Sequence, residues 1–351
     1  VKVRLHKQGK SKGRASHVYH LYRSSLMQYI GCDVSKITLD LASLYLATQR
    51  WNKPCQVTNT RRGWDAMINR VKQQFTDEVC VVMEATGVYH LKAASHLSLA
   101  GIKVIIVNPG RAAEYARSMN RTNKSDRLDA CDLARYGAQL DEPHWYQVEA
   151  IEISQLKNLL SRLHQLDKDL RRETNRLEKC DFLEHSQLLA QSIRRSIRFI
   201  KLEQDSVQSL IDQLIKQHPY LKRNQQLMCS IKGIGKKTSQ WLLPILSTQR
   251  FNHAREVAAF LGLVPCHRQS GTSLNSKGRL SGRGNAVLRA KLYMPALCAS
   301  NHDPVLKAFY QDLLARGKTP KQALTAVMRK LVHTCYGVIK HQTPYQANYA
   351  A

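Results

Sequence analysis

Four acidic residues stand at positions where a carboxylate could bind a metal ion. Asp33 interrupts an apolar stretch, where a charge without a partner costs free energy. Glu84 directly follows the apolar run 79–83, and Asp126 and Asp129 would share one face of a helix because they are three residues apart. Carboxylate oxygens suit Mg²⁺ or Mn²⁺, so the set predicts a two-metal site that holds a scissile phosphate.

Each acid also has an ordinary structural explanation. Asp126 could cap a helix, Asp129 could be a solvated helix residue, and Glu84 could form an ion pair. Taken singly, each acid favours the structural explanation. Two acids on predicted strands together with two on one helix face favour phosphoryl-transfer chemistry.

A second group of reactive side chains lies in residues 267–286, a segment without any acid. Its hydroxyls and cations are Ser270, Thr272, Ser273, Ser276, Ser281, Arg268, Lys277, Arg279 and Arg283. A hydroxyl there could attack a phosphodiester while the cations offset charge in the transition state. On composition alone, a flexible phosphate-binding loop without chemistry is the favoured alternative.

The acids need an α/β framework to bring them together. Apolar and β-branched residues predict two strands joined by a turn over 29–46, and buried strands over 79–83 and 102–107. Helices are predicted within 58–73, over 89–99 with Gly101 as the C-terminal cap, around 112–119 and over 125–139. Strands that alternate with helices indicate an α/β layer domain.

The rest of the chain is predicted to be mainly helical. Leucines at three- and four-residue steps from Leu156 onward predict long helices over 151–217, either a coiled coil or a hairpin packed within one chain. Gly233 and Gly235 resemble the turn of a helix-hairpin-helix, whose backbone N–H groups can bind phosphate. A plain helical turn is the alternative there. Further helices are predicted around a polar loop over 266–285.

The net charge favours a polyanionic partner. The chain has 54 Lys and Arg against 26 Asp and Glu, for a formal net charge of +28. Over 257–351 the only acids are Asp303 and Asp312, against thirteen Lys and Arg. This field predicts nucleic acid binding, and a solubility device or a ribosome-type protein is the alternative.

Cysteine spacing and hydropathy exclude several classes of protein. The nine cysteines form no C-x-x-C pair, so zinc-finger spacing is absent and free thiols in a reducing cytosol are expected. No apolar run of about 18 residues predicts a membrane span. The basic first 26 residues lack the apolar core of a signal peptide. They are either a disordered arm or upstream sequence before a natural start at Met27, and the second is favoured.

Taken together, the motifs resemble the DEDD-type insertion-sequence transposases, whose relatives include the pilin-gene inverting recombinase and the bridge-RNA-guided recombinases. The resemblance covers about residues 28–340. In the first half it is carried by Gly31-Cys32-Asp33, Glu84-Ala85-Thr86-Gly87, Asn108-Pro109 and RTNKSDRLD at 121–129. In the second half it is carried by GIGKKTS at 233–239, FLGLVP at 260–265, SGTS at 270–273, LYMPAL at 292–297 and MRKL at 328–331.

The resemblance implies roles for the two reactive groups. It implies a RuvC-like, RNase H-type domain that binds Mg²⁺ through Asp33, Glu84, Asp126 and Asp129. It implies a second domain whose nucleophile is Ser270, and composite sites in which the acids of one subunit face the serine of another. Cys32 replaces an aliphatic residue and Ser125 replaces a common Thr, but neither change removes a ligand.

The expected organisation has four parts. They are a basic leader (1–27), an α/β RNase H/RuvC-like domain (28–148), a helical coiled-coil linker (149–222) and a mainly α-helical, serine-bearing transposase domain (223–345).

Nucleic-acid contacts are expected from Arg121, Asn123, Lys124, Gly233, Gly235, Lys236, Lys237, Arg268, Lys277, Arg279 and Arg283. A covalent serine–DNA link would conserve phosphodiester energy, so strands could be rejoined.

The expected partners are the element ends and target DNA, with copies of the chain in a homodimer or homotetramer, and the expected location is the bacterial cytoplasm. Use of a structured guide RNA stays open, as does transposition versus inversion. The alternatives are a hydrolytic RuvC-like nuclease, which needs the acids but no serine, and a non-catalytic nucleic-acid-binding protein. Four carboxylates argue against the last, because added negative charge does not favour nucleic acid binding.

Overall fold

The chain forms two compact units, residues 1–148 and 149–351. The computed structural model describes residues 27–45, 50–51, 55–75, 78–119, 126–248, 251–270, 274–280 and 284–347. At 45, 50–51, 266–270 and 274–279 it describes the backbone alone.

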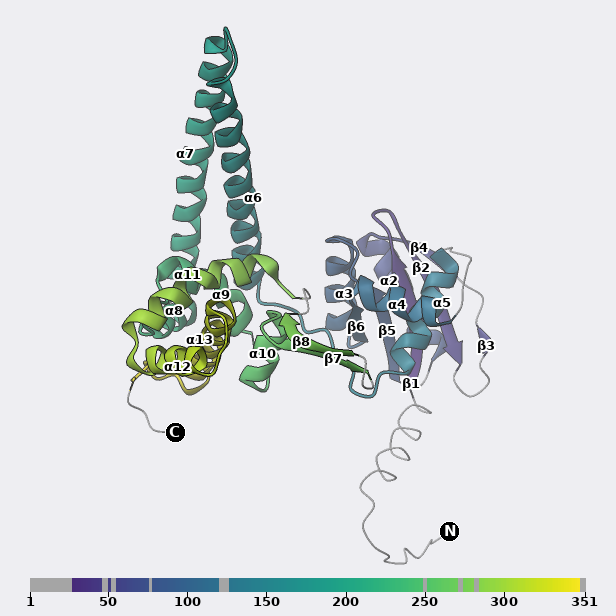
Figure 1. The fold of residues 1–351 in the computed structure, drawn as a ribbon. Helices are drawn as coiled ribbons and strands as arrows, with labels where there is room; N and C mark the ends of the chain where they lie inside the picture. Colours follow the sequence, from purple (N-terminus) through teal and green to yellow (C-terminus); the bar gives the residue numbers. More distant parts are fainter. Residues whose placement is uncertain are drawn as a thin grey trace, which may run out of the picture. The chain divides into compact units, whose positions relative to one another are not determined.

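Unit 1 is built on one mixed sheet (Figure 1). Its strands are β1 (Met27–Val34), β2 (Thr38–Tyr45), β3 (Arg50–Trp51), β4 (Cys55–Thr58), β5 (Glu78–Glu84) and β6 (Lys103–Val107). The order is β3-β2-β1-β5-β6, and β4 also pairs with β2. β1 is antiparallel to β2 and parallel to β5, which is parallel to β6. The carboxyl ends of β1, β5 and β6 therefore lie at one edge.

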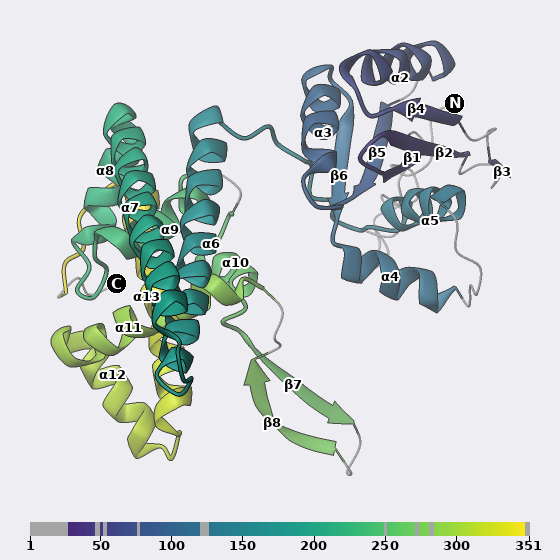
Figure 2. The same cartoon turned by 90° about the horizontal axis from the view of Figure 1, so that it is seen from above.

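Helices cover both faces of this sheet (Figure 2). α2 (Arg61–Gln74) and α3 (Tyr89–Leu99) pack on the face that carries Ile30, Cys32 and Val81. α4 (Pro109–Ser118) and α5 (Asp126–Ala138) lie on the face that carries Tyr29 and Val82. Alternate residues of one strand point to opposite faces, which explains the two separate cores. The α/β layer class predicted for this part is confirmed, and the finer RuvC-like assignment stays a prediction.

The predicted end of α3 at Gly101 is confirmed. Gly101 has a φ of 84°, a left-handed conformation that favours glycine. The Ile102 N–H donates to the Leu97 carbonyl at 3.1 Å, and the Gly101 N–H donates to the Ser98 carbonyl at 3.1 Å. This pair of hydrogen bonds is the Schellman arrangement, which satisfies the last carbonyl groups of a helix.

Unit 2 consists mainly of helices. They are α6 (Ile151–Cys180), α7 (Gln187–Gln217), α8 (Pro219–Cys229), α9 (Lys236–Leu246), α10 (Ala254–Phe260), α11 (Ala286–His302), α12 (Pro304–Ala315) and α13 (Pro320–His341). α6 and α7 pack against each other as an antiparallel hairpin of one chain (Figure 1), which is one of the two arrangements left open by the sequence. Leu156, Leu160 and Ile211 share one core with α8 to α13, so the base of the hairpin belongs to the helical body.

The prediction of an irregular polar loop over 266–285 is wrong in part. β7 (Pro265–Ser270) and β8 (Leu274–Leu280) form an antiparallel two-stranded ribbon within it, with an irregular register between Cys266 and Arg268. A two-stranded ribbon satisfies backbone hydrogen bonds across the pair and does not require an apolar face, so polar composition hides it. None of the described helices is long and apolar enough to cross a membrane. All eight cysteines whose thiols are described are free.

Candidate active site

Asp33 and Glu84 lie side by side at the carboxyl edge of the sheet. Cys32 of β1 is the register partner of Met83 of β5, so the next residue on each strand places the two acids on adjacent strands. Tyr29 and Val82 face α5, and side chains alternate along a strand, so both acids are on the α5 face. Each is only partly buried, because the sheet ends there.

α5 brings the other two acids to this face. Asp126 is the first residue of the helix and is exposed, while Asp129 is partly buried one turn further on. The helix lies close to the sheet because its residue 137 is glycine. A Cβ at Gly137 would lie 2.4 Å from Cγ2 of Val82. The sheet and helix therefore present the four predicted acids together.

The charges of the four acids are coupled through Asp33. Burial, and then the carboxylates of Asp126 and Asp129, raise the pKa of Asp33 from 3.8 to about 6. Glu84 adds a smaller rise. The Val34 N–H donates to Oδ1 of Asp33 at 3.0 Å and opposes these effects. Carboxylates gathered around Asp33 in this way are a candidate site for a cation.

The donor set fits a hard divalent cation. Among the described residues, no three His, Cys, Asp or Glu side chains already form a compact cage for an ion. The four acids offer oxygen ligands only, which suits Mg²⁺ or Mn²⁺. Their mutual repulsion, seen at Asp33, would be relieved by a cation between them. Asp33, Glu84, Asp126 and Asp129 are therefore candidate ligands for such an ion.

Asp40 is a fifth carboxylate at this site that sequence reasoning missed. It is the direct cross-strand partner of Asp33 in the antiparallel register, so the two side chains point to the same face. The Gln56 side-chain amide on β4 donates to both carboxylate oxygens of Asp40, at 2.9 and 3.1 Å. The alternation of apolar and polar residues over 38–42 places Asp40 opposite the core face, but it does not reveal its partner.

Ser270 is the last residue of β7 and pairs with Leu274 of β8. Its backbone is described, and it belongs to unit 2 while the acids belong to unit 1. Arg268 lies on β7, and Lys277 and Arg279 lie on β8, so the ribbon carries three of the predicted phosphate contacts. Four further predicted nucleic-acid contacts lie outside the described residues: Arg121, Asn123, Lys124 and Arg283.

The two glycines of the turn before α9 differ in their surroundings: Gly233 is closely packed and Gly235 has open space around it. Gly233 has a φ of 93°, and a Cβ there would lie 2.5 Å from the Pro295 carbonyl oxygen, so this glycine lets the turn pack on α11. Gly235 is the N-cap residue of α9 and provides no side-chain cap. Lys236 and Lys237 follow it and are exposed, so the first turn of α9 can still meet an anion.

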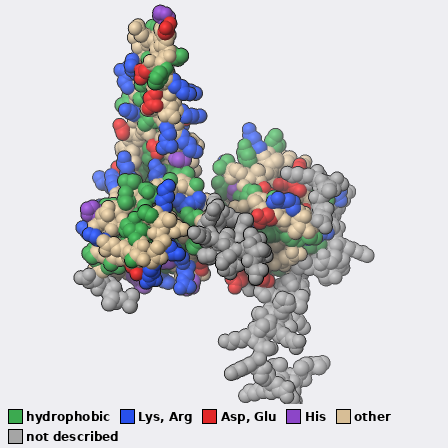
Figure 3. All heavy atoms as spheres, in the orientation of Figure 1, with side chains coloured by type: hydrophobic (Ala, Val, Ile, Leu, Met, Phe, Trp, Pro, Cys, Tyr) green, Lys and Arg blue, Asp and Glu red, His purple; other side chains and the backbone are tan. Residues whose placement is uncertain are grey.

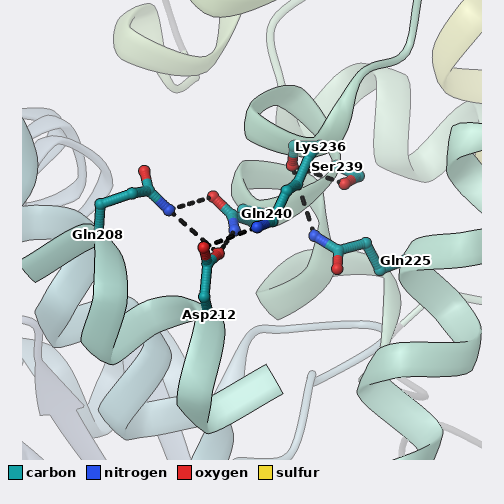
Figure 4. Close-up of polar contacts among 6 residues, drawn as sticks. All are labelled: Gln208, Asp212, Gln225, Lys236, Ser239 and Gln240. Carbon is teal, nitrogen blue, oxygen red and sulfur yellow. Dashed lines mark hydrogen bonds and ion pairs between the residues drawn. The ribbon is translucent and has the colours of Figure 1, made fainter. Parts of the chain in front are cut away.

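Lys236 is held in a polar network between α7 and α9 (Figure 4). Its Nζ lies 2.6 Å from Oδ2 of Asp212, and Nε2 of Gln240 donates to Oδ1 of the same carboxylate at 2.7 Å. Gln208 donates to the Gln240 side-chain oxygen at 3.0 Å. The network ties the hairpin to the glycine turn. Lys236 is therefore an ion-pair partner as well as a predicted phosphate contact.

The described surface carries the charge asymmetry seen in the sequence. On the face in Figure 3, Lys and Arg side chains line the α6–α7 hairpin, with some Asp and Glu among them, and border the helical body, while unit 1 shows both signs of charge. A basic surface in the unit that carries the serine ribbon suits a nucleic acid backbone.

Sequence comparisons agree across most of the chain. A DEDD-type IS110 family profile described as "Transposase" matches residues 30–183, and one described as "Transposase IS116/IS110/IS902 family" matches residues 225–311. A pilin gene-inverting protein of Moraxella bovis is 33% identical over 324 residues, 90% of this chain and 97% of that protein. An IS110 protein of 43.6 kDa from Streptomyces coelicolor is 26% identical over 165 residues, 47% of this chain and 40% of that protein.

A solved structure also overlaps with part of the chain. T. thermophilus RuvC in complex with a Holliday junction substrate matches 32% of this chain and 92% of its own, with 16% identity and a TM-score of 0.26. An overlap at this level carries no conclusion about fold or chemistry.

Proposed function

Because this chain belongs to the IS116/IS110/IS902 family of transposases, enzymes that act on DNA, we propose that it cuts and rejoins DNA strands through Ser270. In this proposal Asp33, Glu84, Asp126 and Asp129 bind Mg²⁺, or Mn²⁺ in its place. The observation that supports the metal site is the convergence of the other three acids on Asp33, whose pKa rises to about 6.

The serine would act as the nucleophile on phosphorus. A bond forms between its Oγ and the phosphorus as the bond from phosphorus to the leaving sugar oxygen breaks, the hydroxyl proton passes to solvent, and the leaving oxygen takes up a proton to become a sugar hydroxyl. The resulting phosphodiester keeps the bond energy, so the reverse attack by a sugar hydroxyl rejoins the strand without an external energy source. Arg268, Lys277 and Arg279 on the ribbon would offset negative charge on the transferring group.

The acids would supply the second half of the site. When bound, Mg²⁺ provides Lewis-acid stabilisation of charge on the phosphate oxygens. Asp33 and Glu84 extend from fixed strand ends, so they would hold their carboxylates in place, while Asp126 and Asp129 would close the site from α5. We place this chemistry in a RuvC-like domain over 28–148 and the serine in a transposase domain over 223–345, with the helical segment 149–222 used in assembly.

The test uses the purified full-length chain, element-end DNA and Mg²⁺, with a covalent protein–DNA adduct measured on a denaturing gel. Ser270→Ala abolishes the adduct, whereas Ser273→Ala, a matched change in the same segment, leaves it. An adduct with Ser270→Ala rules out Ser270 as the nucleophile. Full strand cleavage by Ser270→Ala, with none by Asp126→Ala, supports a hydrolytic nuclease instead.

Site-specific inversion is a second candidate reaction. The 33% identity to a pilin gene-inverting protein over 90% of this chain favours it. A substrate with two inverted sites distinguishes the two reactions. Inversion reverses the DNA between the sites and keeps it in the same molecule, whereas transposition releases an element. Guidance by RNA is tested by running each reaction with and without a transcript of the element's flank. If RNA guides the reaction, product forms only when the transcript is present.

A further inference from the structure

A cavity of about 310 Å³ lies in unit 2, between α6, α9, α10 and the first turn of α11. Its lining is rich in rings: Trp241 on α9, Phe260 on α10, Phe251 before α10 and His164 on α6. The Trp241 and His164 rings meet edge to face at 6.2 Å between centroids, and Phe251 and Phe260 are 5.5 Å apart. Its volume is at the lower end of the range for small-molecule sites, about 300–1,000 Å³.

His164 adds an uncharged ring to this aromatic cavity. Both ring nitrogens are shielded from solvent, and within the described part of the chain neither makes a hydrogen bond. Burial, and then the charges of Lys168 and Lys291, lower the pKa of His164, so its ring is neutral at pH 7. Because both nitrogens have almost no accessible surface, His164 lines the cavity with its uncharged ring and not with its nitrogens.

Positive charge stands beside the rings. Nζ of Lys291 lies 5.2 Å from the centroid of the Trp241 ring and 3.0 Å from Oδ2 of Asp167. Lys157, which pairs with Glu149, is part of the lining. Each of these lysines is already paired with an acid, so the rings are what select the ligand, and they favour a flat aromatic group such as a nucleobase.

The cavity also adjoins the roots of the serine ribbon. Phe260 ends α10, a few residues before β7 begins at Pro265. Asn285, which lines the cavity, follows β8 and caps α11 by accepting from the Leu288 N–H at 3.1 Å. Both ends of the ribbon that carries Ser270 therefore start from elements that line the cavity.

We propose that this cavity holds one unpaired nucleobase of a single-stranded nucleic acid, stacked among Trp241, Phe251 and Phe260. The proposal rests on the proposed function, because strand cleavage beside the ribbon supplies unpaired nucleotides there. The base can come from DNA or from RNA, since both have the same aromatic face and hydrogen-bonding edges.

The test fills the cavity from its rim. Ser161 is exposed on α6 and lines the cavity, so Ser161→Phe places a ring in it without disturbing the core. Ser154→Phe, an equally exposed change on the same helix that does not line the cavity, is the matched control. The probes are single strands of about ten nucleotides with one 2-aminopurine, as DNA and as RNA, whose fluorescence falls when that base stacks on a ring.

The full-length chain and Ser154→Phe quench 2-aminopurine, and Ser161→Phe weakens this binding about tenfold or more, as expected for loss of one stacked base. The strand that is quenched, DNA or RNA, identifies the source of the base. Equal quenching by Ser161→Phe and by the full-length chain overturns the proposal. Adduct formation is measured in parallel. If the chain forms Ser270-dependent adducts but Ser161→Phe binds the probe as well as the full-length chain does, the base site alone is refuted. If the chain forms no adduct, the proposed function is refuted.

Discussion

Gly31 of β1 lies directly against the backbone of Ala130 in α5. A Cβ at Gly31 would come within 1.7 Å of the Ala130 carbonyl oxygen and 2.7 Å of the Ala134 nitrogen. The contact therefore requires glycine for space. It sets the distance between the strand that carries Asp33 and the helix that carries Asp129, which is adjacent to Ala130.

We expect Gly31→Ala to lower both stability and activity. The added methyl group must push α5 away from β1, and overpacking of this kind costs about 1–3 kcal/mol. It also moves Asp129 away from Asp33, so the DNA adduct is lost even where the protein remains folded. Urea unfolding and the adduct assay measure the two effects. Gly337→Ala, at a helical glycine with open space, is the control, and equal behaviour of both variants would contradict this role.

The raised pKa of Asp33 makes the metal-free protein sensitive to pH. The native state holds the Asp33 proton up to about pH 6, whereas the unfolded chain releases it near 3.8. Stability therefore falls as the pH rises through this window and stays lower above it. We expect Asp33→Asn to raise the Tm of metal-free protein at pH 7.5 and to have little effect below pH 4.

Addition of Mg²⁺ distinguishes repulsion among the carboxylates from general effects of a substitution on stability. Wild-type protein gains Tm with Mg²⁺ at pH 7.5, because cation binding requires the charged carboxylates and stabilises the folded state. Asp33→Asn gains less, while Asp205→Asn, an exposed acid on α7, behaves as wild type. A metal response that is identical in Asp33→Asn and wild type would remove Asp33 from the ligand set.

A composite site predicts complementation between two inactive variants. Asp126→Ala lacks an acid and Ser270→Ala lacks the proposed nucleophile, so neither forms an adduct alone. If acids and serine come from different subunits, oligomers that contain both variants regain one intact site. Coexpression with two affinity tags and an adduct assay on the mixed species measures this. Asp126→Ala with Asp33→Asn is the control, and no recovery in the first mixture would place both groups in one subunit.

The Lys236–Asp212 network predicts a local stability effect. Gln240, buried to 1% exposure, depends on Asp212 for an acceptor, so Asp212→Ala leaves its amide without this partner. We expect a loss of about 1–3 kcal/mol of unfolding free energy. Asp212→Asn keeps an oxygen for Gln240 and loses less, and Asp205→Ala is an exposed control on the same helix. Equal stability of Asp212→Ala and Asp205→Ala in urea would refute the structural role.

Exposed apolar side chains on α7 predict a surface for self-association. Leu188, Phe199 and Leu202 are 81%, 67% and 70% exposed, and their spacing places them along one stripe of the helix. A second copy of the chain is the expected partner, so Leu202→Glu should weaken association about tenfold or more. Sedimentation at several concentrations measures it, with Asn175→Glu on α6 as the control. An unchanged mass distribution for Leu202→Glu would exclude the stripe from the interface.

Hydrophobic periodicity was sufficient to predict the strands and helices that carry the four acids. The buried runs before Glu84 and around Asp33 are strong local patterns. The parallel pairing of their strands is seen only in the structure, because β2, β3, β4 and α2 separate them in the chain. Asp40 was missed because its importance depends on cross-strand register, which no local pattern contains. The β7–β8 ribbon was missed because its residues are polar, and the aromatic cavity because its lining comes from separate helices.

Each unit is one continuous stretch of chain, with the division at Val148 and Glu149. The strands and helix that carry the acids are thus complete on the ribosome before any residue of the second unit is added. Domains generally fold as units during synthesis, N-terminal first. In the order of translation, the unit that carries the four acids can mature while the proposed nucleophile is still untranslated, so on the proposed function a growing chain cannot form a DNA adduct until its second unit has emerged.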